Sequence, residues 1–324
     1  MRPIEVRDLR KAYGDVQAVD GVSFEIERGE VFALLGPNGA GKTTVVETIE
    51  GHRTADSGEV RVLGHDPARR ERALRERIGI VLQEAGFDED ATVVELVRLH
   101  RDLYPRRLDA DAVIELVGLT AKRSARVRTL SGGQRRRLDL ALGLVGDPEV
   151  LFLDEPTVGF DPEARRQAWS IIRDLRANGT TVLLTTHYLD EAQHLADRVA
   201  VVVAGRLVAL GTPEALAARG RATVIEFRSV DAVDAGGAEG GAGGAGGGLH
   251  RVLGDTAAVE RDGALWRVTT DDATAALHAM TGWSLDRQVA LDGIEVRRPT
   301  LEDAYLELVG ERAVRAGTDE AVPA

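Results

Sequence analysis

The chain has 324 residues, of which 44% are hydrophobic, and it carries a formal net charge of -12. This length allows one large or two modest domains with buried cores. The acidic balance gives little support to a surface that follows nucleic-acid phosphates, and the lack of cysteine excludes disulfides, thiolate metal sites and cysteine nucleophiles. The first residues contain no apolar signal segment, and residues 199–210, the most apolar stretch, are shorter than the roughly 20 residues that span a bilayer. We therefore expect a cytoplasmic chain that reaches a membrane only through a partner.

The first elements in chain order form a strand, a loop and a helix. Residues 22–27 alternate apolar and polar side chains like a half-buried strand, and residues 31–35 are continuously apolar like a buried one. A glycine-rich loop follows, and residues 43–49 then predict a helix that ends near Gly51.

Further strands and helices alternate up to about residue 210. We predict strands at residues 78–82, 150–153 and 181–185, and a mostly helical segment at residues 92–144. A helix between the last two strands has apolar residues at i, i+3, i+4 and i+7, which are Ala168, Ile171, Ile172 and Leu175. Strands that alternate with helices predict an α/β fold with a mostly parallel sheet covered on both faces.

The remainder of the chain predicts a second, smaller α+β domain. Its expected elements are residues 222–227, 257–261, 264–269, 273–280 and 294–297, with a closing helix at residues 300–309. Residues 235–248 are glycine and alanine with one glutamate, so we expect a flexible loop that interrupts this domain. The predicted limits are 1–218 for the first domain, with a helical subdomain at about 88–146, 219–310 for the second, and a disordered tail at 311–324.

The loop after the strand at residues 31–35 carries the clearest chemical motif. It matches the phosphate-loop pattern GxxxxGK[ST] at every fixed position, between a predicted strand and a predicted helix. The expected nucleotide-binding residues are Gly36, Pro37, Asn38, Gly39, Ala40, Gly41, Lys42, Thr43 and Thr44. Backbone N–H groups would surround phosphate oxygens, Lys42 would contact the β and γ phosphates, and Thr43 would offer a hydroxyl to Mg²⁺. The alternative is a turn that only joins strand to helix.

An acidic pair ends the strand at residues 150–153. Asp154 fits a carboxylate ligand of Mg²⁺, and Glu155 is placed to polarise an attacking water. Without other motifs, both would be interpreted as solvated charges at a strand end. A short helix upstream begins near the sequence Leu-Ser-Gly-Gly-Gln at residues 130–134, where a glycine could cap a helix at residues 135–144.

Taken together, these motifs resemble the ATPase subunit of ATP-binding-cassette (ABC) transporters, a phosphate-loop NTPase fold, over approximately residues 4–213. The resemblance implies that Tyr13 stacks on adenine and that Gln83 senses Mg²⁺ and the γ-phosphate region. It implies that the signature residues Ser131, Gly132, Gly133 and Gln134 close over ATP bound to another subunit. It also implies that Asp161 lies in the loop between two ATP sites and that His187 contacts the γ-phosphate.

Each of these side chains also has a simpler interpretation. Tyr13 could be a surface aromatic, Gln83 a solvated side chain, and His187 a histidine satisfied at a strand end. Asp161 precedes proline and is also a good helix N-cap. Phe160 stands where leucine or alanine is commoner in the family, which leaves Asp161 in register.

The end of the second domain indicates a subfamily. Residues 298–308 resemble the closing helix of bacterial drug-exporter ATPases of the daunorubicin-resistance type, although a generic amphipathic helix would also fit. The resemblance implies an ATPase that uses ATP and Mg²⁺ to energise export of a drug-like, antibiotic or other small molecule. It implies a second copy or a paralogous ATPase subunit as one partner and an integral-membrane permease as another, at the cytoplasmic side of the membrane, without nucleic acid. The alternatives are a soluble ATP switch of the same superfamily with a non-permease partner and a nucleotide binder that does not hydrolyse ATP.

Overall fold

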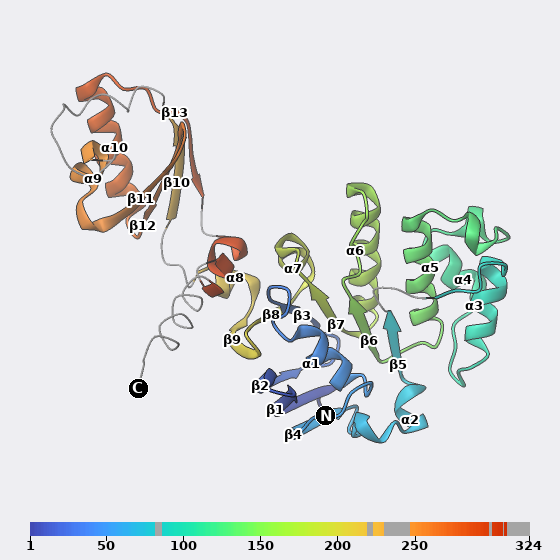
Figure 1. Cartoon of the computed structure of the whole chain (residues 1–324). Coiled ribbons are helices and arrows are strands. Elements are labelled where there is room, and N and C mark those ends of the chain that lie inside the picture. Colours follow the sequence, from blue (N-terminus) through green and yellow to red (C-terminus); the bar gives the residue numbers. More distant parts are fainter. Residues whose placement is uncertain (82–85, 219–222, 230–246, 298–299, 307, 310–324) are drawn as a thin grey trace. The chain divides into compact units, whose positions relative to one another are not determined.

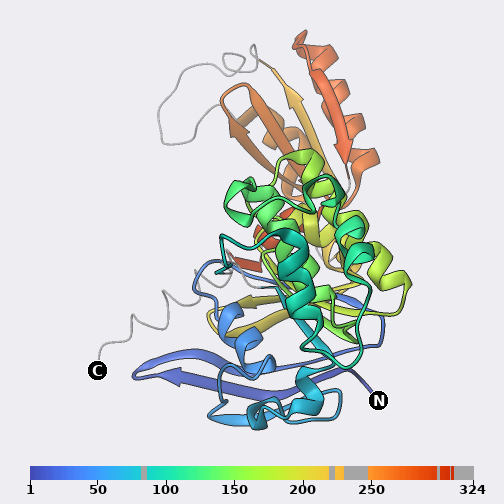
Figure 2. The ribbon, with the colours of Figure 1, turned by 90° about the vertical axis from the view of Figure 1, so that its right-hand side faces the viewer.

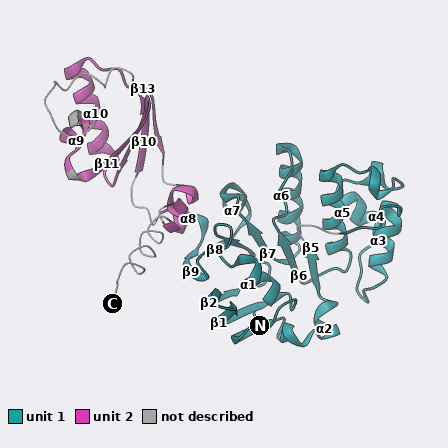
Figure 3. Ribbon diagram, viewed as in Figure 1, with its two compact units in different colours: residues 1–213, 312–324 teal, residues 214–311 magenta. Residues whose placement is uncertain are grey.

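The computed structural model describes residues 1–81, 86–218, 223–229, 247–297, 300–306 and 308–309. These residues form two compact units, one within residues 1–213 (unit 1) and one within residues 214–311 (unit 2), which Figure 3 colours separately. The domain limits suggested by the sequence stay predictions. No helix in the described ranges combines the length and the apolar character needed to cross a membrane.

A six-stranded sheet forms the centre of unit 1 (Figure 1), in the order β5-β6-β7-β3-β8-β9. Its strands are β3 (Val31–Leu35), β5 (Ile78–Val81), β6 (Val150–Asp154), β7 (Thr181–Thr186), β8 (Arg198–Val203) and β9 (Arg206–Gly211). All neighbours are parallel except β8 and β9, which confirms the predicted mostly parallel sheet. Every side chain of β3 and β7 is buried, as expected where both faces are covered.

A second sheet in unit 1 is antiparallel and has the order β2-β1-β4. It consists of β1 (Ile4–Tyr13), β2 (Val16–Ile26) and β4 (Ser57–Val62), and the long β1–β2 hairpin is blue in Figure 2. Its apolar face shares one core with α1 (Lys42–Ile49) and the six-stranded sheet, where Phe24 and Phe32 stack with ring centroids 5.0 Å apart. The sequence had indicated only residues 22–27 of this sheet.

Helices complete unit 1. Against the six-stranded sheet lie α6 (Pro162–Ala177) and α7 (Leu189–Leu195), and α6 buries the four residues predicted for its inner face. The helical part contains α3 (Val93–Arg101), α4 (Ala110–Leu116) and α5 (Gly132–Leu144), which lie together in Figure 1. The short α2 (Arg72–Arg75) precedes β5.

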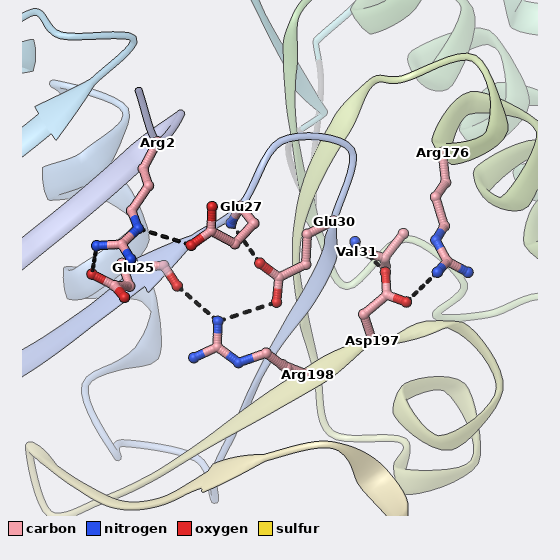
Figure 4. A network of polar contacts seen from close by, with 8 residues as sticks. All are labelled: Arg2, Glu25, Glu27, Glu30, Val31, Arg176, Asp197 and Arg198. Atoms are coloured by element: carbon pink, nitrogen blue, oxygen red, sulfur yellow. Dashed lines mark hydrogen bonds and ion pairs between the residues drawn. The ribbon is translucent and has the colours of Figure 1, made fainter.

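Polar contacts hold the end of β3 that lies opposite the glycine-rich loop (Figure 4). The Val31 backbone N–H donates to Asp197 at 3.0 Å, and Asp197 also pairs with Arg176 of α6. Glu30 contacts Arg198 at 3.4 Å, and burial raises the pKa of Glu30. Since β3 is fixed at this end, the loop at its other end starts from a rigid strand.

Unit 2 is an α+β unit. Its antiparallel sheet has the order β11-β12-β10-β13, formed by β10 (Thr223–Arg228), β11 (Ala257–Asp262), β12 (Leu265–Thr270) and β13 (Asp292–Arg297). The helices α9 (Gly247–Leu253) and α10 (Ala273–Arg287) bury apolar side chains with this sheet, among them Trp266 and Trp283. The short α8 (Pro213–Ala217) precedes the sheet.

Two sequence expectations for unit 2 are corrected. The predicted flexible loop at residues 235–248 is wrong at its end, because Gly247 and Gly248 belong to α9, while residues 235–246 lie outside the described residues. The helix expected at residues 273–280 continues to Arg287, where Gln288 adopts a left-handed conformation as its C-cap. The closing helix is present at residues 301–306, and the tail at 311–324 lies outside the described residues.

Candidate active site

The loop from Gly36 to Gly41 connects β3 directly to α1. A Cβ atom on Gly36 would lie 2.2 Å from the carbonyl oxygen of Val202, and one on Gly41 would lie 2.2 Å from that of Ala18. Gly41 is also the N-cap of α1, with a left-handed φ of 96°. Only glycine fits these two positions, so the loop approaches its neighbours more closely than any side chain would permit.

Lys42 lies at the first position of α1 and points back over the loop. Its Nζ donates to the carbonyl oxygens of Gly36 at 2.7 Å and Pro37 at 3.1 Å. Burial lowers the pKa of Lys42, while the carboxylates of Glu155 and Asp154 act in the opposite direction. The ammonium is thus partly desolvated and interacts electrostatically with the carboxylates at the end of β6, as a phosphate-binding lysine would.

The acidic pair at the end of β6 is held by the neighbouring strand β7. Asp154 lies opposite Thr185 in the parallel register, and its carboxylate accepts a hydrogen bond from the Thr185 hydroxyl. Glu155 has a left-handed φ of 47°, which is uncommon for a residue other than glycine. Its N–H donates to the carbonyl oxygen of Thr185 at 3.1 Å and also lies 3.2 Å from the hydroxyl.

The structure brings His187 and Glu155 together. His187 Nδ1 lies 3.0 Å from Glu155 Oε1, although 32 positions separate the two residues. The Glu155 side chain is 16% exposed and that of His187 is 42% exposed, so both reach solvent at the end of the sheet. With Nδ1 protonated, His187 donates to the carboxylate and fixes its orientation.

The signature residues form the N-terminus of α5. Ser131 is the N-cap: its hydroxyl accepts from the Gln134 N–H, and the Gln134 side chain accepts from the Ser131 N–H at 3.1 Å. The expectation that a glycine caps a helix at residues 135–144 is therefore wrong, because a serine hydroxyl satisfies a free backbone donor that glycine cannot. Ser131 and Gly132 are exposed, and Gly133 is half-buried.

Three further predicted residues occupy separate places. Tyr13 ends β1, is 41% exposed, and has the Arg53 guanidinium 5.4 Å from its ring centroid. Asp161 caps α6 by accepting from the N–H groups of Glu163 at 2.9 Å and Ala164 at 2.8 Å, which confirms the predicted capping. Gln83 lies outside the described residues.

The residues present fit a nucleotide and a hard divalent cation. The close-packed glycine loop, the start of α1 and Lys42 provide the N–H groups and positive charge that polyphosphate requires. Thr43 is exposed beside Lys42, and Asp154 ends the adjacent acidic strand, so the oxygen donors available are those that Mg²⁺ prefers. Within the described ranges, no group of three or more acidic or histidine side chains could bind a metal alone.

Two polar residues near the site were not predicted from the sequence. Thr185 could have been found, because a threonine at the end of a predicted strand beside β6 would lie opposite Asp154. Arg136 gave no such signal, since it lies within a run of three arginines, yet its guanidinium contacts the end of β6.

The fold and the site define a phosphate-loop nucleotide-binding protein. The ABC transporter family model matches residues 19–158, and the model of the C-terminal domain of ABC transporter domain-containing proteins matches residues 249–300. The chain is 40% identical over 313 residues to the daunorubicin resistance ATP-binding protein DrrA3 of Streptomyces coeruleorubidus, covering 95% of this chain and 96% of that protein. It is 38% identical to the daunorubicin/doxorubicin resistance ATP-binding protein DrrA of Streptomyces peucetius, with 99% and 96% covered.

Solved structures agree with this relationship. An ATP-binding subunit of an ABC transporter matches with a TM-score of 0.61 and 26% identity, covering 67% of this chain and 92% of that one. The cbiO1 protein of Clostridium perfringens, part of the ABC transporter complex cbiONQ, matches with a TM-score of 0.59 and 30% identity, covering 66% and 90%. The chain belongs to the ABC transporter ATP-binding subunits, of the drug-resistance exporter type, and is an ATP-binding ATPase.

Proposed function

We propose that this chain hydrolyses ATP as half of a nucleotide-sandwich dimer and thereby energises export of a drug-like, antibiotic or other small molecule through a separate membrane permease. The second half is another copy or a paralogous ATPase subunit. One observation supports the proposed dimer. Ser131 and Gly132 are exposed at the start of α5, and a Cβ on Gly132 or Gly133 would meet no atom within 4 Å. This helix start presents open backbone N–H groups that a phosphate of the partner's nucleotide can approach.

Within one site, different residues of the chain bind the phosphates, polarise the attacking water and hold Mg²⁺. Lys42 and the glycine loop hold the β and γ phosphates, and Glu155 accepts a hydrogen bond from the attacking water and polarises it. His187 orients the Glu155 carboxylate through the 3.0 Å contact. Thr43 and Asp154, with Gln83, would hold Mg²⁺, which neutralises charge on the phosphates when it is bound.

The permease and the cargo are supported by relatives. Besides the daunorubicin-resistance proteins, the chain is 44% identical over 220 residues to the Nod factor export ATP-binding protein I of Paraburkholderia xenovorans (strain LB400), covering 66% of this chain and 72% of that protein. Such relatives support a location at the cytoplasmic side of the membrane, peripheral through the permease. Tyr13 stacking on adenine and Asp161 between the two sites belong to the same proposal.

The enzymatic part is tested with two variants and a control. Glu155→Gln should bind ATP, lose phosphate release and accumulate an ATP-bound dimer, whereas Lys42→Ala should lose ATP affinity. Glu115→Gln changes an exposed carboxylate on α4 and should match the wild type. Phosphate release, nucleotide titration and light scattering measure these properties. Wild-type turnover in Glu155→Gln would refute its role, and undiminished ATP affinity in Lys42→Ala would refute the phosphate-loop assignment.

The partner is tested by purification of the tagged chain from its native cell. Recovery from membranes with a multi-span protein supports the exporter, and recovery with ribosomes or DNA instead would favour a soluble switch. Phosphate release should be measured with and without those membranes, because the permease can stimulate turnover.

A further inference from the structure

Arg136 of α5 reaches the acidic end of β6. Its Nη2 donates to the carbonyl oxygen of Asp154 at 2.5 Å and to that of Glu155 at 3.0 Å. Its side chain is only 10% exposed, and its Nη1 lies 3.9 Å from Asp139 on the next turn of the same helix. The guanidinium thus forms a part-buried link from the signature helix to the end of β6, across 18 positions of sequence.

The backbone that Arg136 contacts has an unfavourable conformation. Glu155 has a φ of 47°, and a left-handed conformation costs an ordinary residue free energy that the surroundings must offset. On one side of Glu155, its N–H is bonded to Thr185 of β7. On the other side, Arg136 donates to the Glu155 carbonyl. The turn that aims the Glu155 carboxylate is therefore held from two elements, β7 and α5.

An arginine suits this contact for a geometric reason. A single guanidinium nitrogen carries two hydrogens, which here serve two successive carbonyl oxygens, and the planar group loses little freedom when it is fixed. Burial lowers the pKa of Arg136, while the carboxylates of Asp139, Asp154, Glu155 and Glu191 act in the opposite direction. The carboxylates thus favour the charged form in spite of burial.

We propose that Arg136 is a positioning residue for ATP hydrolysis, which holds the Asp154–Glu155 turn from α5 and so sets the place of the water-polarising carboxylate. It acts through Glu155 and does not itself contact nucleotide. The proposal rests on the proposed function, because it assigns Glu155 the role described above. Through Arg136, the backbone of Glu155 is connected to α5, the helix that presents the signature residues.

The test compares Arg136→Met and Arg136→Lys with Arg101→Met in the full chain. Methionine retains length and apolar volume without a donor, and lysine retains the charge. Arg101 is a matched control, since its guanidinium also donates to a backbone carbonyl, that of Leu108 at 3.0 Å, but within the helical part and away from β6. The readouts are kcat and KM for phosphate release, ATP affinity, ATP-dependent dimer formation and the unfolding midpoint.

We expect Arg136→Met to lower kcat about 100-fold, as a small misplacement of a catalytic group does. Its ATP affinity should stay within about threefold of the wild type, and it should accumulate the ATP-bound dimer as Glu155→Gln does. Arg136→Lys should recover part of the lost kcat. A purely structural role would lower affinity, dimer formation and the unfolding midpoint together.

Two results would overturn the inference. One is a kcat of Arg136→Met equal to that of Arg101→Met, and the other is a parallel loss of turnover, affinity and dimer formation. If Arg136→Met does not fold, the Arg136→Lys variant provides the test. A reduced kcat with retained ATP affinity in that variant supports the inference, whereas a wild-type kcat overturns it. A wild-type chain that binds ATP without hydrolysing it would instead overturn the proposed function itself.

Discussion

Three alanine substitutions in the phosphate loop separate two physical reasons for its glycines. Gly41 has a left-handed φ of 96°, and an added Cβ would lie 2.2 Å from the Ala18 carbonyl oxygen. Gly39 has a φ of 78° with no atom within 4 Å of the added Cβ. Gly36 has no left-handed φ, but its Cβ would lie 2.2 Å from the Val202 carbonyl oxygen. Gly41→Ala therefore combines strain with overlap, Gly39→Ala has strain alone, and Gly36→Ala has overlap alone.

The structure sets the expected magnitudes. A left-handed conformation costs an L-residue about 1–2 kcal/mol. Forcing an additional carbon into a packed region costs about 1–3 kcal/mol. We therefore expect Gly39→Ala to lower the free energy of unfolding of unit 1 by about 1–2 kcal/mol, and Gly36→Ala by about 1–3 kcal/mol. Gly41→Ala should lose about 2–5 kcal/mol, the sum of the two terms.

Urea unfolding with linear extrapolation measures these differences. The chain has three tryptophans. Trp169 is buried in unit 1, whereas Trp266 and Trp283 lie in unit 2. Changing the latter two to phenylalanine makes fluorescence report on unit 1 alone. ATP titration should show Gly41→Ala as the weakest binder of the three. If Gly41→Ala is no more destabilising than Gly39→Ala, overlap with Ala18 is not a reason for the glycine.

Three more predictions concern other parts of the chain. Gly133→Ala should leave the unfolding free energy unchanged or raise it by up to about 1 kcal/mol, because its Cβ meets open space in a helix, yet lower phosphate release; a large loss of stability would contradict this. Burial raises the pKa of Glu50 to about 8, so the folded state keeps a proton that the unfolded state releases, and stability should fall as pH rises from about 4.5 to about 8. Glu50→Gln should remove that decline in unfolding experiments across this pH range, and an identical pH profile would refute the assignment. Although burial of Asp303 acts to raise its pKa, hydrogen bonds from Arg297 and Thr300 hold it at about 2, so its contribution is present above pH 3.8 and disappears as pH falls through 2. Solvent screens this partly exposed carboxylate, so Asp303→Asn should destabilise unit 2 at pH 7 by about 1 kcal/mol, as followed by Trp266 fluorescence.

Local features of the fold were predictable from the sequence. The loop between β3 and α1 depends on three closely spaced glycines, Gly36, Gly39 and Gly41, and the buried face of α6 follows from helical spacing of Ala168 to Leu175. The hairpin that carries Tyr13 was not predicted, because a register shift between Val6 and Leu9 interrupts the apolar–polar alternation of β1. We predicted a glycine as the N-cap of α5, whereas the N-cap is the neighbouring Ser131.

The sequence alone determined the chemical inventory of this protein: a phosphate loop, an acidic strand end, a signature segment and a histidine, in an order that indicated the ABC family. Such motifs can be recognised in the sequence because each meets a local backbone or charge requirement within a few consecutive residues. Which of these side chains meet depends on how the strands and helices pack. The order β6-β7-β3 places Thr185 opposite Asp154 and His187 beside Glu155. The packing of α5 brings Arg136 to the same turn, because contacts between distant residues depend on strand order and helix packing, which no short motif encodes.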